Sequence, residues 1–146
     1  MTEEQRTLLA RRLRAAIEQQ HEIEALRMLL LKRGGSELVA PPSSDPDLPA
    51  LIERGFIMPG AATCEEIESS ACHENVARLW LDKSHGLSCI GTGYALSEDG
   101  LWRQHSWGIR EDAIVETTVR RLKYFGIVLH GDVADAFARN NTDAQQ

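Results

Sequence analysis

Residues 87–109 read LSCIGTGYALSEDGLWRQHSWGI, and this stretch determines the fold class. Residues 87–96 and residues 101–109 each predict a β-strand, because apolar and aromatic runs bounded by turn residues are typical of strands. Between them, Ser97-Glu98-Asp99-Gly100 predicts a tight turn with Gly100 in the left-handed conformation. Strands joined by so short a connection pair antiparallel, so we expect a β-hairpin here.

The residues after the hairpin extend it into an antiparallel meander. Residues 110–112 predict a turn, and residues 113–118, which read AIVETT, predict a third strand. Residues 119–129 are ambiguous and are compatible with a turn followed by a final strand. Residues 132–139 predict a short closing helix.

Helices are predicted before the hairpin. Residues 2–33 contain no Gly or Pro and predict one or two helices, with the apolar stripe broken at Gln20 and His21. Residues 47–55 predict a short helix. A further helix is expected around Cys72 and should end near residues 84–86, because four apolar residues share one helical face: Cys72, Val76, Leu79 and Trp80.

Composition divides the chain into four parts. Residues 1–33 form a helical arm, and residues 34–59 form a connector that contains all five prolines. Residues 60–140 form a compact domain, and residues 141–146 form a disordered polar tail. Because helices come first and an antiparallel sheet follows, the predicted fold class is α+β.

Charge and composition exclude several classes of protein. The 146 residues include 16 basic and 22 acidic ones, a net charge of −6, which argues against a nucleic-acid-binding protein. The longest uninterrupted run of apolar side chains, residues 28–31, is far shorter than the roughly 18 residues of a membrane span. The N-terminus MTEEQRTLLA lacks the basic and apolar pattern of a signal peptide. Three cysteines fit a reducing compartment, so we expect a cytoplasmic domain without membrane association.

Three polar residues lie where a thiol hydrolase needs them. Cys72 is expected near a helix start, where the helix dipole favours a thiolate nucleophile. His105 is expected within the second strand as the general acid and base, and Glu116 within the third strand as the carboxylate that orients it. The short turn between these strands predicts that His105 and Glu116 lie approximately opposite each other, close enough for a hydrogen bond.

These residues also resemble a known family, the transglutaminase-like branch of the papain-like cysteine hydrolases, over residues 70–125. That family carries a Cys at a helix start, a G-Y strand about twenty residues later, an H-x-W strand and a D-x-T strand. Here Gly93-Tyr94 begins 21 positions after Cys72, and His105-Ser106-Trp107 matches H-x-W. Glu116-Thr117-Thr118 takes the place of D-x-T.

Residues 72–76, which read CHENV, are also similar to the cysteine region of N-terminal glutamine amidohydrolases, another branch of the superfamily. The resemblance implies a core in which a cysteine-bearing helix packs on an antiparallel sheet. It implies the same roles for Cys72, His105 and Glu116. This chain departs from the family in having Glu rather than Asp at position 116, which lengthens the side chain by one methylene.

Other signals oppose a reactive Cys72. Thr63 and Glu66 fit a capping box, which allows one continuous helix over residues 64–82 with Cys72 in its middle. No glutamine is evident for an oxyanion hole, so the backbone N–H of Cys72 would have to serve. Three acidic residues precede Cys72, and their charge opposes thiolate formation: Glu65, Glu66 and Glu68.

Alternative sites are weaker. Cys64 is a rival nucleophile at the start of the helix that the capping box predicts, and Cys89 is expected in the core. Five residues are near one another in sequence but lack zinc-site spacing, so no metal is expected: Cys64, Cys72, His73, His85 and Cys89. Gly91-Thr92-Gly93 precedes no helix, so it does not predict a phosphate site.

Substrate contacts are expected near the sheet. The glycines are expected to let a substrate backbone approach, and we assign substrate binding to Gly93, Tyr94 and Trp107. Two further aromatic residues, Trp102 and Tyr124, are candidates for pocket walls, although core packing is expected for at least two of the four aromatics.

The sequence therefore predicts a small hydrolase or acyltransferase that acts on an amide bond through a thioester. It would be a deamidase, a peptidase or a transglutaminase-type enzyme, with a peptide, protein or small amide substrate and no cofactor. The alternative is a non-catalytic binding or adaptor module of the same fold. Residues 2–33 are a candidate homodimer contact, and a third hypothesis is a regulator that acts through this arm.

Overall fold

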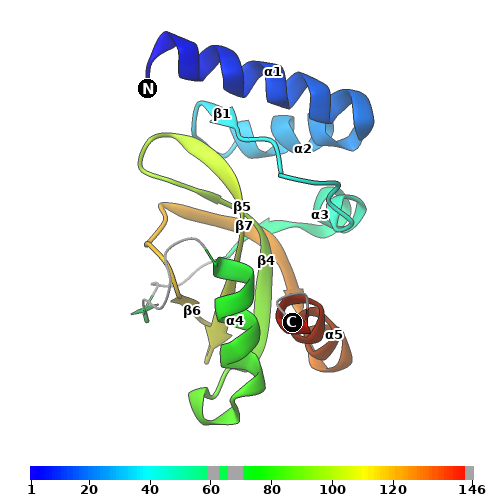
Figure 1. Ribbon diagram of the computed structural model, residues 1–146. Coiled ribbons are helices and arrows are strands. Elements are labelled where there is room, and N and C mark those ends of the chain that lie inside the picture. The colour runs from blue at the N-terminus through cyan, green and yellow to red at the C-terminus, as the bar shows by residue number, and fades with distance from the viewer. Residues whose placement is uncertain (59–62, 66–70, 144–146) are drawn as a thin grey trace.

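The computed structural model describes residues 1–58, 63–65 and 71–143. Within these residues the chain forms five α-helices, a 3₁₀ turn and a seven-stranded, mostly antiparallel sheet, which confirms the predicted α+β class (Figure 1). No helix among them is both long and apolar enough to cross a membrane. The helices are α1 (Glu3–Gln19), α2 (Glu22–Leu31), α3 (Leu48–Arg54), α4 (Cys72–Leu81) and α5 (Gly131–Asp143). The strands are β1 (Glu37–Leu38), β2 (Phe56–Ile57), β3 (Thr63–Cys64), β4 (Cys89–Leu96), β5 (Leu101–Arg110), β6 (Ala113–Glu116) and β7 (Lys123–Leu129).

The predicted hairpin forms the centre of the sheet. Strands β4 and β5 pair antiparallel with Gly93 opposite His105. Gly100 adopts the left-handed conformation at φ +85° and closes the turn, as predicted. The next turn uses two non-glycine residues with positive φ, Glu111 at 50° and Asp112 at 67°, which matches the twist of a tight hairpin.

The last strand returns across the sheet. Strand order is β2-β7-β4-β5-β6-β3, so β7 pairs antiparallel with β4 rather than with β6, its neighbour in sequence. Two-residue strands extend the sheet by parallel pairing, β1 with β5 and β3 with β6. Segments this short carry no sequence pattern, so only their pairing partners reveal them.

Two predictions about helix boundaries need correction. Thr63 does not start a helix, because it lies in β3 and pairs with Val115, and its expected capping partner Glu66 lies outside the described residues. A continuous helix over residues 64–82 is therefore wrong, and α4 begins at Cys72. The closing helix is longer than the predicted 132–139, because α5 extends to Asp143.

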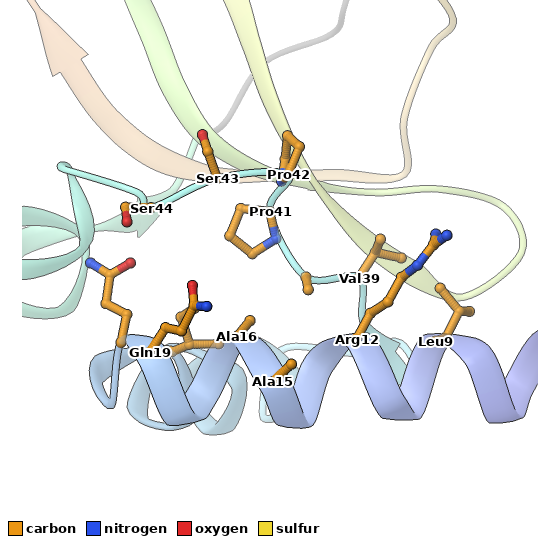
Figure 2. Close-up of a pocket in the computed structure, with 13 residues that line it drawn as sticks. Leu9, Arg12, Ala15, Ala16, Gln19, Val39, Pro41, Pro42, Ser43 and Ser44 are labelled. Atoms are coloured by element: carbon orange, nitrogen blue, oxygen red, sulfur yellow. The ribbon is translucent and has the colours of Figure 1, made fainter.

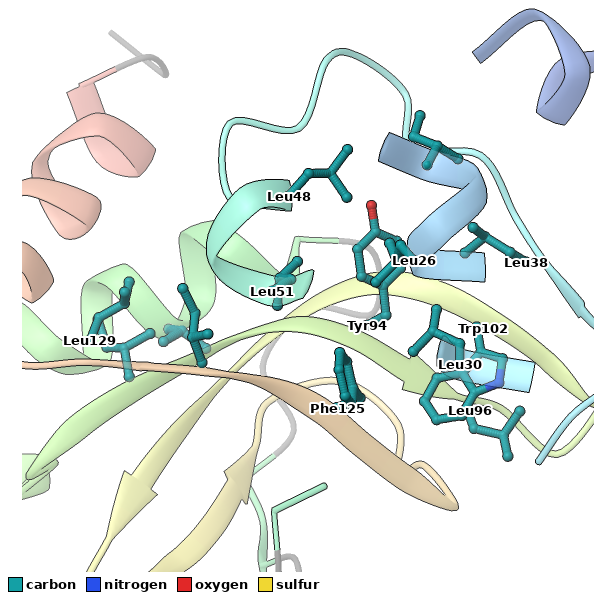
Figure 3. Close-up of a cluster of buried hydrophobic side chains, with 14 of the residues drawn as sticks. Leu26, Leu30, Leu38, Leu48, Leu51, Tyr94, Leu96, Trp102, Phe125 and Leu129 are labelled. Carbon is teal, nitrogen blue, oxygen red and sulfur yellow. The ribbon is translucent and has the colours of Figure 1, made fainter. Parts of the chain in front are cut away.

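The larger core cluster lies on one face of the sheet and includes buried residues from all five helices. Figure 1 shows α1 along one end of the molecule and α4 beside α5 towards the other. Figure 3 shows the leucines of α2 and α3 gathered on the aromatic side chains of the sheet. The labelled residues from these elements are Leu26, Leu30, Leu48, Leu51, Tyr94, Trp102 and Phe125.

The predicted arm is two helices that break at Gln20, as the sequence indicates. The Gln20 side chain donates to the carbonyl of Asp45 at 2.9 Å and accepts from its N–H at 3.0 Å, which attaches the break to the connector. Leu13 is the buried residue of α1, whereas α2 buries Ile23, Leu26 and Leu30. Dimerisation through residues 2–33 stays a prediction.

The opposite face of the sheet carries a smaller cluster that includes Trp107, Ile109 and Tyr124. On β5, Trp102 belongs to the helix-covered face and Trp107 to this one, as the two-residue period of a strand requires. His105 shares the parity of Trp107, so its imidazole also belongs to this smaller cluster's face.

Candidate active site

Cys72 is the first residue of α4, as predicted. The preceding residue, Ala71, has φ −119° and ψ 46° and provides no side-chain cap. The first backbone hydrogen bond of the helix runs from the N–H of Asn75 to the carbonyl of Ala71 at 2.8 Å. The N–H groups of Cys72 and His73 therefore have no carbonyl partner within the helix, and the half-buried thiol lies at the positive end of the helix dipole.

His105 and Glu116 are in contact inside the protein. Nε2 of His105 lies 2.8 Å from Oε1 of Glu116 and 3.1 Å from its Oε2. The two residues are 2% and 0% exposed. Cys72 lies close enough to His105 for the imidazole to lower the pKa of its thiol. Because Nε2 contacts Glu116, the ring nitrogen left for the thiol is Nδ1.

The hydrogen bond predicted between His105 and Glu116 is present, but the two residues are not directly opposite each other. Strands β5 and β6 pair with Gly108 opposite Val115, so continuing this register would put Trp107 opposite Glu116. His105 is thus a diagonal neighbour of Glu116, two residues along β5 from the opposing position. The extra methylene of Glu, compared with Asp, lengthens the reach across this diagonal.

An open strand edge brings Cys72 to His105. The pairing of β5 with β6 covers residues 108–110 only, so in the described part of the chain residues 103–107 pair with β4 alone. The backbone N–H of Ser106 also acts on the Cys72 sulfur at this point and lowers the pKa of the thiol. The first turn of α4 therefore occupies the edge position that β6 leaves free.

In the described part of the chain, four hydrogen-bond donors surround the Glu116 carboxylate. Besides His105, the Tyr124 hydroxyl donates to Oε1 at 2.7 Å. The N–H and hydroxyl of Thr118 donate to Oε2 at 3.0 and 2.9 Å. Burial acts to raise the pKa of Glu116, but these donors, with His105 first, lower it to about 2. The carboxylate is therefore charged at neutral pH.

The pKa values of the other two groups shift in opposite directions. Burial acts to raise the pKa of Cys72, but the hydrogen bond and charge of His105 outweigh it, so the pKa is lowered from 9.0. Burial acts to lower the pKa of His105, but its hydrogen bonds to Cys72 and Glu116 raise it above 6.5. Both shifts favour a thiolate–imidazolium pair.

Of the three acidic residues before Cys72, only Glu65 lies within the described part of the chain. Glu65 forms an ion pair with Arg110 at 2.8 Å, so its charge is compensated. Glu66 and Glu68 lie outside the described residues.

The other two cysteines lack these contacts. Cys64 is exposed, lies opposite Glu116 in the β3–β6 pair, and donates its thiol to the carbonyl of Thr118 at 3.6 Å. It starts no helix, which removes the basis for treating it as a rival nucleophile. Cys89 is buried in the smaller cluster, and burial raises the pKa of its thiol.

The residues assigned to substrate binding contact protein atoms. Tyr94 is fully buried and donates its hydroxyl to Asp45 at 2.8 Å. The indole N–H of Trp107 donates to the sulfur of Met58 at 3.3 Å. A Cβ on Gly93 would lie 2.2 Å from the carbonyl oxygen of Phe125, so this glycine allows close approach of β7. Their binding of substrate stays a prediction.

Sequence reasoning missed the contact between Tyr124 and Glu116. Tyr124 was a candidate pocket wall, but its ring lies 6.1 Å from that of His105 and 5.0 Å from that of Trp107. In the sheet, β7 and β6 are separated by β4 and β5, so the contact requires the sheet to curve around these side chains. The alternation along β7 could assign Tyr124 to a face, but not to this partner.

A cavity of about 490 Å³ lies elsewhere, between α1 and residues 39–44 of the connector. Figure 2 shows Arg12, Ala16 and Gln19 of α1 on one side of it and Pro41 of the connector on the other. None of the candidate catalytic residues lines this cavity. The described residues also contain no group of three or more His, Cys, Asp or Glu side chains placed to hold a metal ion.

Comparisons of the chain with protein-family models, curated proteins and solved structures found no match.

Proposed function

We propose that the protein is a cysteine-dependent hydrolase or acyltransferase that acts on an amide bond. The observation that carries this proposal is the contact chain from the Cys72 thiol through His105 to the Glu116 carboxylate. A buried carboxylate and imidazole have a substantial desolvation cost, and here both are arranged behind a half-buried thiol at a helix start. The arrangement matches what nucleophilic thiol catalysis requires.

The reaction proceeds in two stages. The Cys72 thiolate attacks the amide carbonyl carbon, and the His105 imidazolium gives its proton to the departing nitrogen as the C–N bond breaks. A thioester and a free amine or ammonia result. His105 then takes a proton from water, or from a second amine, which attacks the thioester and returns the sulfur to its thiolate form, with the proton back on His105.

The backbone N–H groups at the start of α4 are the available donors for the oxyanion. Those of Cys72 and His73 have no carbonyl partner within the helix and lie next to the nucleophile. Glu116 holds His105 in position and favours its charged form. We also propose that α4 with β4, β5 and β6 corresponds to the cysteine-bearing core of the transglutaminase-like and papain-like hydrolases.

The test measures iodoacetamide labelling of each cysteine against pH, with mass spectrometry to distinguish the three sites. We expect Cys72 to label with an apparent pKa clearly below the free-thiol value of about 8.5 and to label faster than Cys64 at neutral pH. Ammonia release from a glutamine-containing peptide then tests turnover. The Cys72→Ala variant should abolish it, and Cys64→Ala, the matched control, should not.

An ordinary pKa for Cys72 would contradict the proposal. So would faster labelling of Cys64 at neutral pH. Either result would favour the non-catalytic binding module, in which Cys72→Ala changes neither activity nor folding.

A further inference from the structure

The residues that directly follow Cys72 and His105 are also in contact. Nδ1 of His73 lies 2.6 Å from Oγ of Ser106, and the same Oγ lies 2.9 Å from Oγ1 of Thr92. Thr92 and Ser106 are opposite each other in the β4–β5 ladder. Ser106 is fully buried and Thr92 nearly so. Three polar side chains thus connect the first turn of α4 to the two central strands.

This chain of contacts lies on the other side of β5 from the catalytic pair. Consecutive strand residues point to opposite faces, so His105 and Ser106 project to different sides of the sheet. Cys72 contacts the first and His73 contacts the second. The first turn of α4 therefore straddles the open edge of β5. Because the first turn of α4 has contacts on both sides of one strand, its translation and rotation relative to β5 are restricted.

We propose that His73 and Ser106, supported by Thr92, are positioning residues that hold the Cys72 sulfur against the His105 imidazole. The inference rests on the proposed function, because it concerns the same thiol. Catalytic groups must be held within about 0.5 Å of their productive geometry, and hydrogen bonds from neighbouring residues are the usual means. A rotation of the first turn would move the sulfur away from His105 without unfolding the helix.

Packing alone does not account for these polar groups. The apolar face of α4 is buried against the core and already holds the helix body: Val76, Ala77, Leu79 and Trp80. Buried hydroxyls add a desolvation cost that an apolar contact would avoid, but their hydrogen bonds fix a direction that apolar contacts do not. Burial and the charge of His105 lower the pKa of His73, against a smaller effect of Asp45, so its ring is neutral beside the imidazolium.

Two substitutions of His73 separate its hydrogen bond from its packing. The ring also packs edge-on against Phe137 of α5, with centroids 6.2 Å apart. His73→Phe keeps an aromatic ring in that place and loses the hydrogen bond to Ser106. His73→Asn loses the ring but places an amide group near the position of Nδ1, so it can restore the hydrogen bond. Ser106→Ala removes Oγ while leaving the backbone N–H that contacts Cys72.

The experiment is the pH profile of iodoacetamide labelling at Cys72 in the full chain. We expect His73→Phe and Ser106→Ala to lower the labelling rate at pH 6.5 about tenfold, equivalent to one unit in the thiol pKa. His73→Asn should label like the unmodified chain. Labelling of Cys89, which is buried, reports in the same spectra whether each variant is folded.

The possible results separate the two proposals. An ordinary Cys72 pKa in the unmodified chain would overturn the proposed function itself. A low pKa there, with unchanged profiles in His73→Phe and Ser106→Ala and protected Cys89, would overturn only the positioning role. If Cys89 becomes exposed in His73→Phe or Ser106→Ala, that variant is not correctly folded. The near-isosteric Thr92→Val is then measured instead. Its profile should shift in the same direction, and an unchanged profile would overturn the inference.

Discussion

The Tyr124 hydroxyl donates to Oε1 of Glu116 at 2.7 Å, the same oxygen that Nε2 of His105 contacts at 2.8 Å. The three residues come from β7, β6 and β5, and the first two strands are not neighbours in the sheet. One carboxylate therefore connects side chains across the curved face of the sheet. This arrangement couples the ionisation of the candidate active site to the packing of β7.

Replacing Tyr124 by Phe should lower both the reactivity of the Cys72 thiol and the free energy of unfolding. Without the hydroxyl, Glu116 loses a hydrogen-bond donor, so its pKa should rise from about 2 and its hold on His105 should weaken. We expect the Cys72 labelling rate at pH 6.5 to fall severalfold. The free energy of unfolding, from urea titration, should fall by about 1.5–3 kcal/mol, as for hydrogen bonds to charged groups.

The matched control is Tyr94→Phe. Tyr94 is equally buried and donates to another carboxylate, Asp45, at 2.8 Å. Loss of the Tyr94 hydroxyl should reduce the free energy of unfolding by a similar amount but leave the labelling rate of Cys72 unchanged. If the two variants affect Cys72 equally, Tyr124 acts through general stability alone.

Replacing Glu116 by Gln should raise the pKa of the Cys72 thiol towards that of a free thiol. The amide cannot stabilise the imidazolium, so the pKa of His105 should fall and that of Cys72 should rise. Direct repulsion between Glu116 and the thiolate is the smallest of the effects on the Cys72 pKa, so the loss of imidazolium should dominate. We expect labelling at pH 6.5 to drop about tenfold, one pKa unit. Glu65→Gln, which changes a carboxylate paired with Arg110, is the control and should leave labelling intact.

Acid should destabilise the protein partly through Glu116. Its pKa is about 2 when folded, below the ordinary 4.5, so its contribution is fully present above pH 4.5 and is lost as the pH falls towards 2. The 2.5-unit difference corresponds to about 3 kcal/mol. Urea unfolding from pH 5 to pH 2.5 should show a steeper loss in the unmodified chain than in Glu116→Gln. Parallel curves for the two proteins would contradict the assigned pKa.

Truncation of α2 residues should distinguish its buried side from its exposed side. Leu26 is 0% exposed and belongs to the main core, so Leu26→Ala should reduce the free energy of unfolding by about 2–5 kcal/mol. Met28, on the same helix, is 54% exposed. Met28→Ala should change stability by less than about 0.5 kcal/mol. Equal losses would mean that Met28 is covered in solution.

Local patterns in the sequence were enough to predict much of the fold. The β4–β5 hairpin follows from two apolar runs around Ser97–Gly100, and the break after α1 follows from Gln20 in an apolar stripe. The position of His105 within a strand and the presence of a helix around Cys72 follow from the same periodicities, whereas the start of that helix at Cys72 does not. These features depend on contacts within a few residues, so the sequence around each of them is sufficient.

The capping signal at Thr63 shows where local reasoning fails. Thr63 and Glu66 have the spacing of a helix start, yet Thr63 pairs with Val115, 52 positions later in the chain. The parallel β3–β6 pairing overrides the local preference. Dipeptide strands such as β3 exist only because a longer strand provides hydrogen-bond partners.

The sequence by itself determined the α+β class, the hairpin and the set of three polar residues Cys72, His105 and Glu116. Only the tertiary structure decided that Glu116 is a diagonal partner of His105, that Tyr124 shares its carboxylate, and that His73 contacts Ser106. The physical reason is that none of these contacts follows from local backbone geometry, although Glu116 lies only 8 residues from Tyr124 and 11 from His105. These contacts depend on the curvature of the sheet and on where β6 leaves β5, and both are set by the packing of the whole domain.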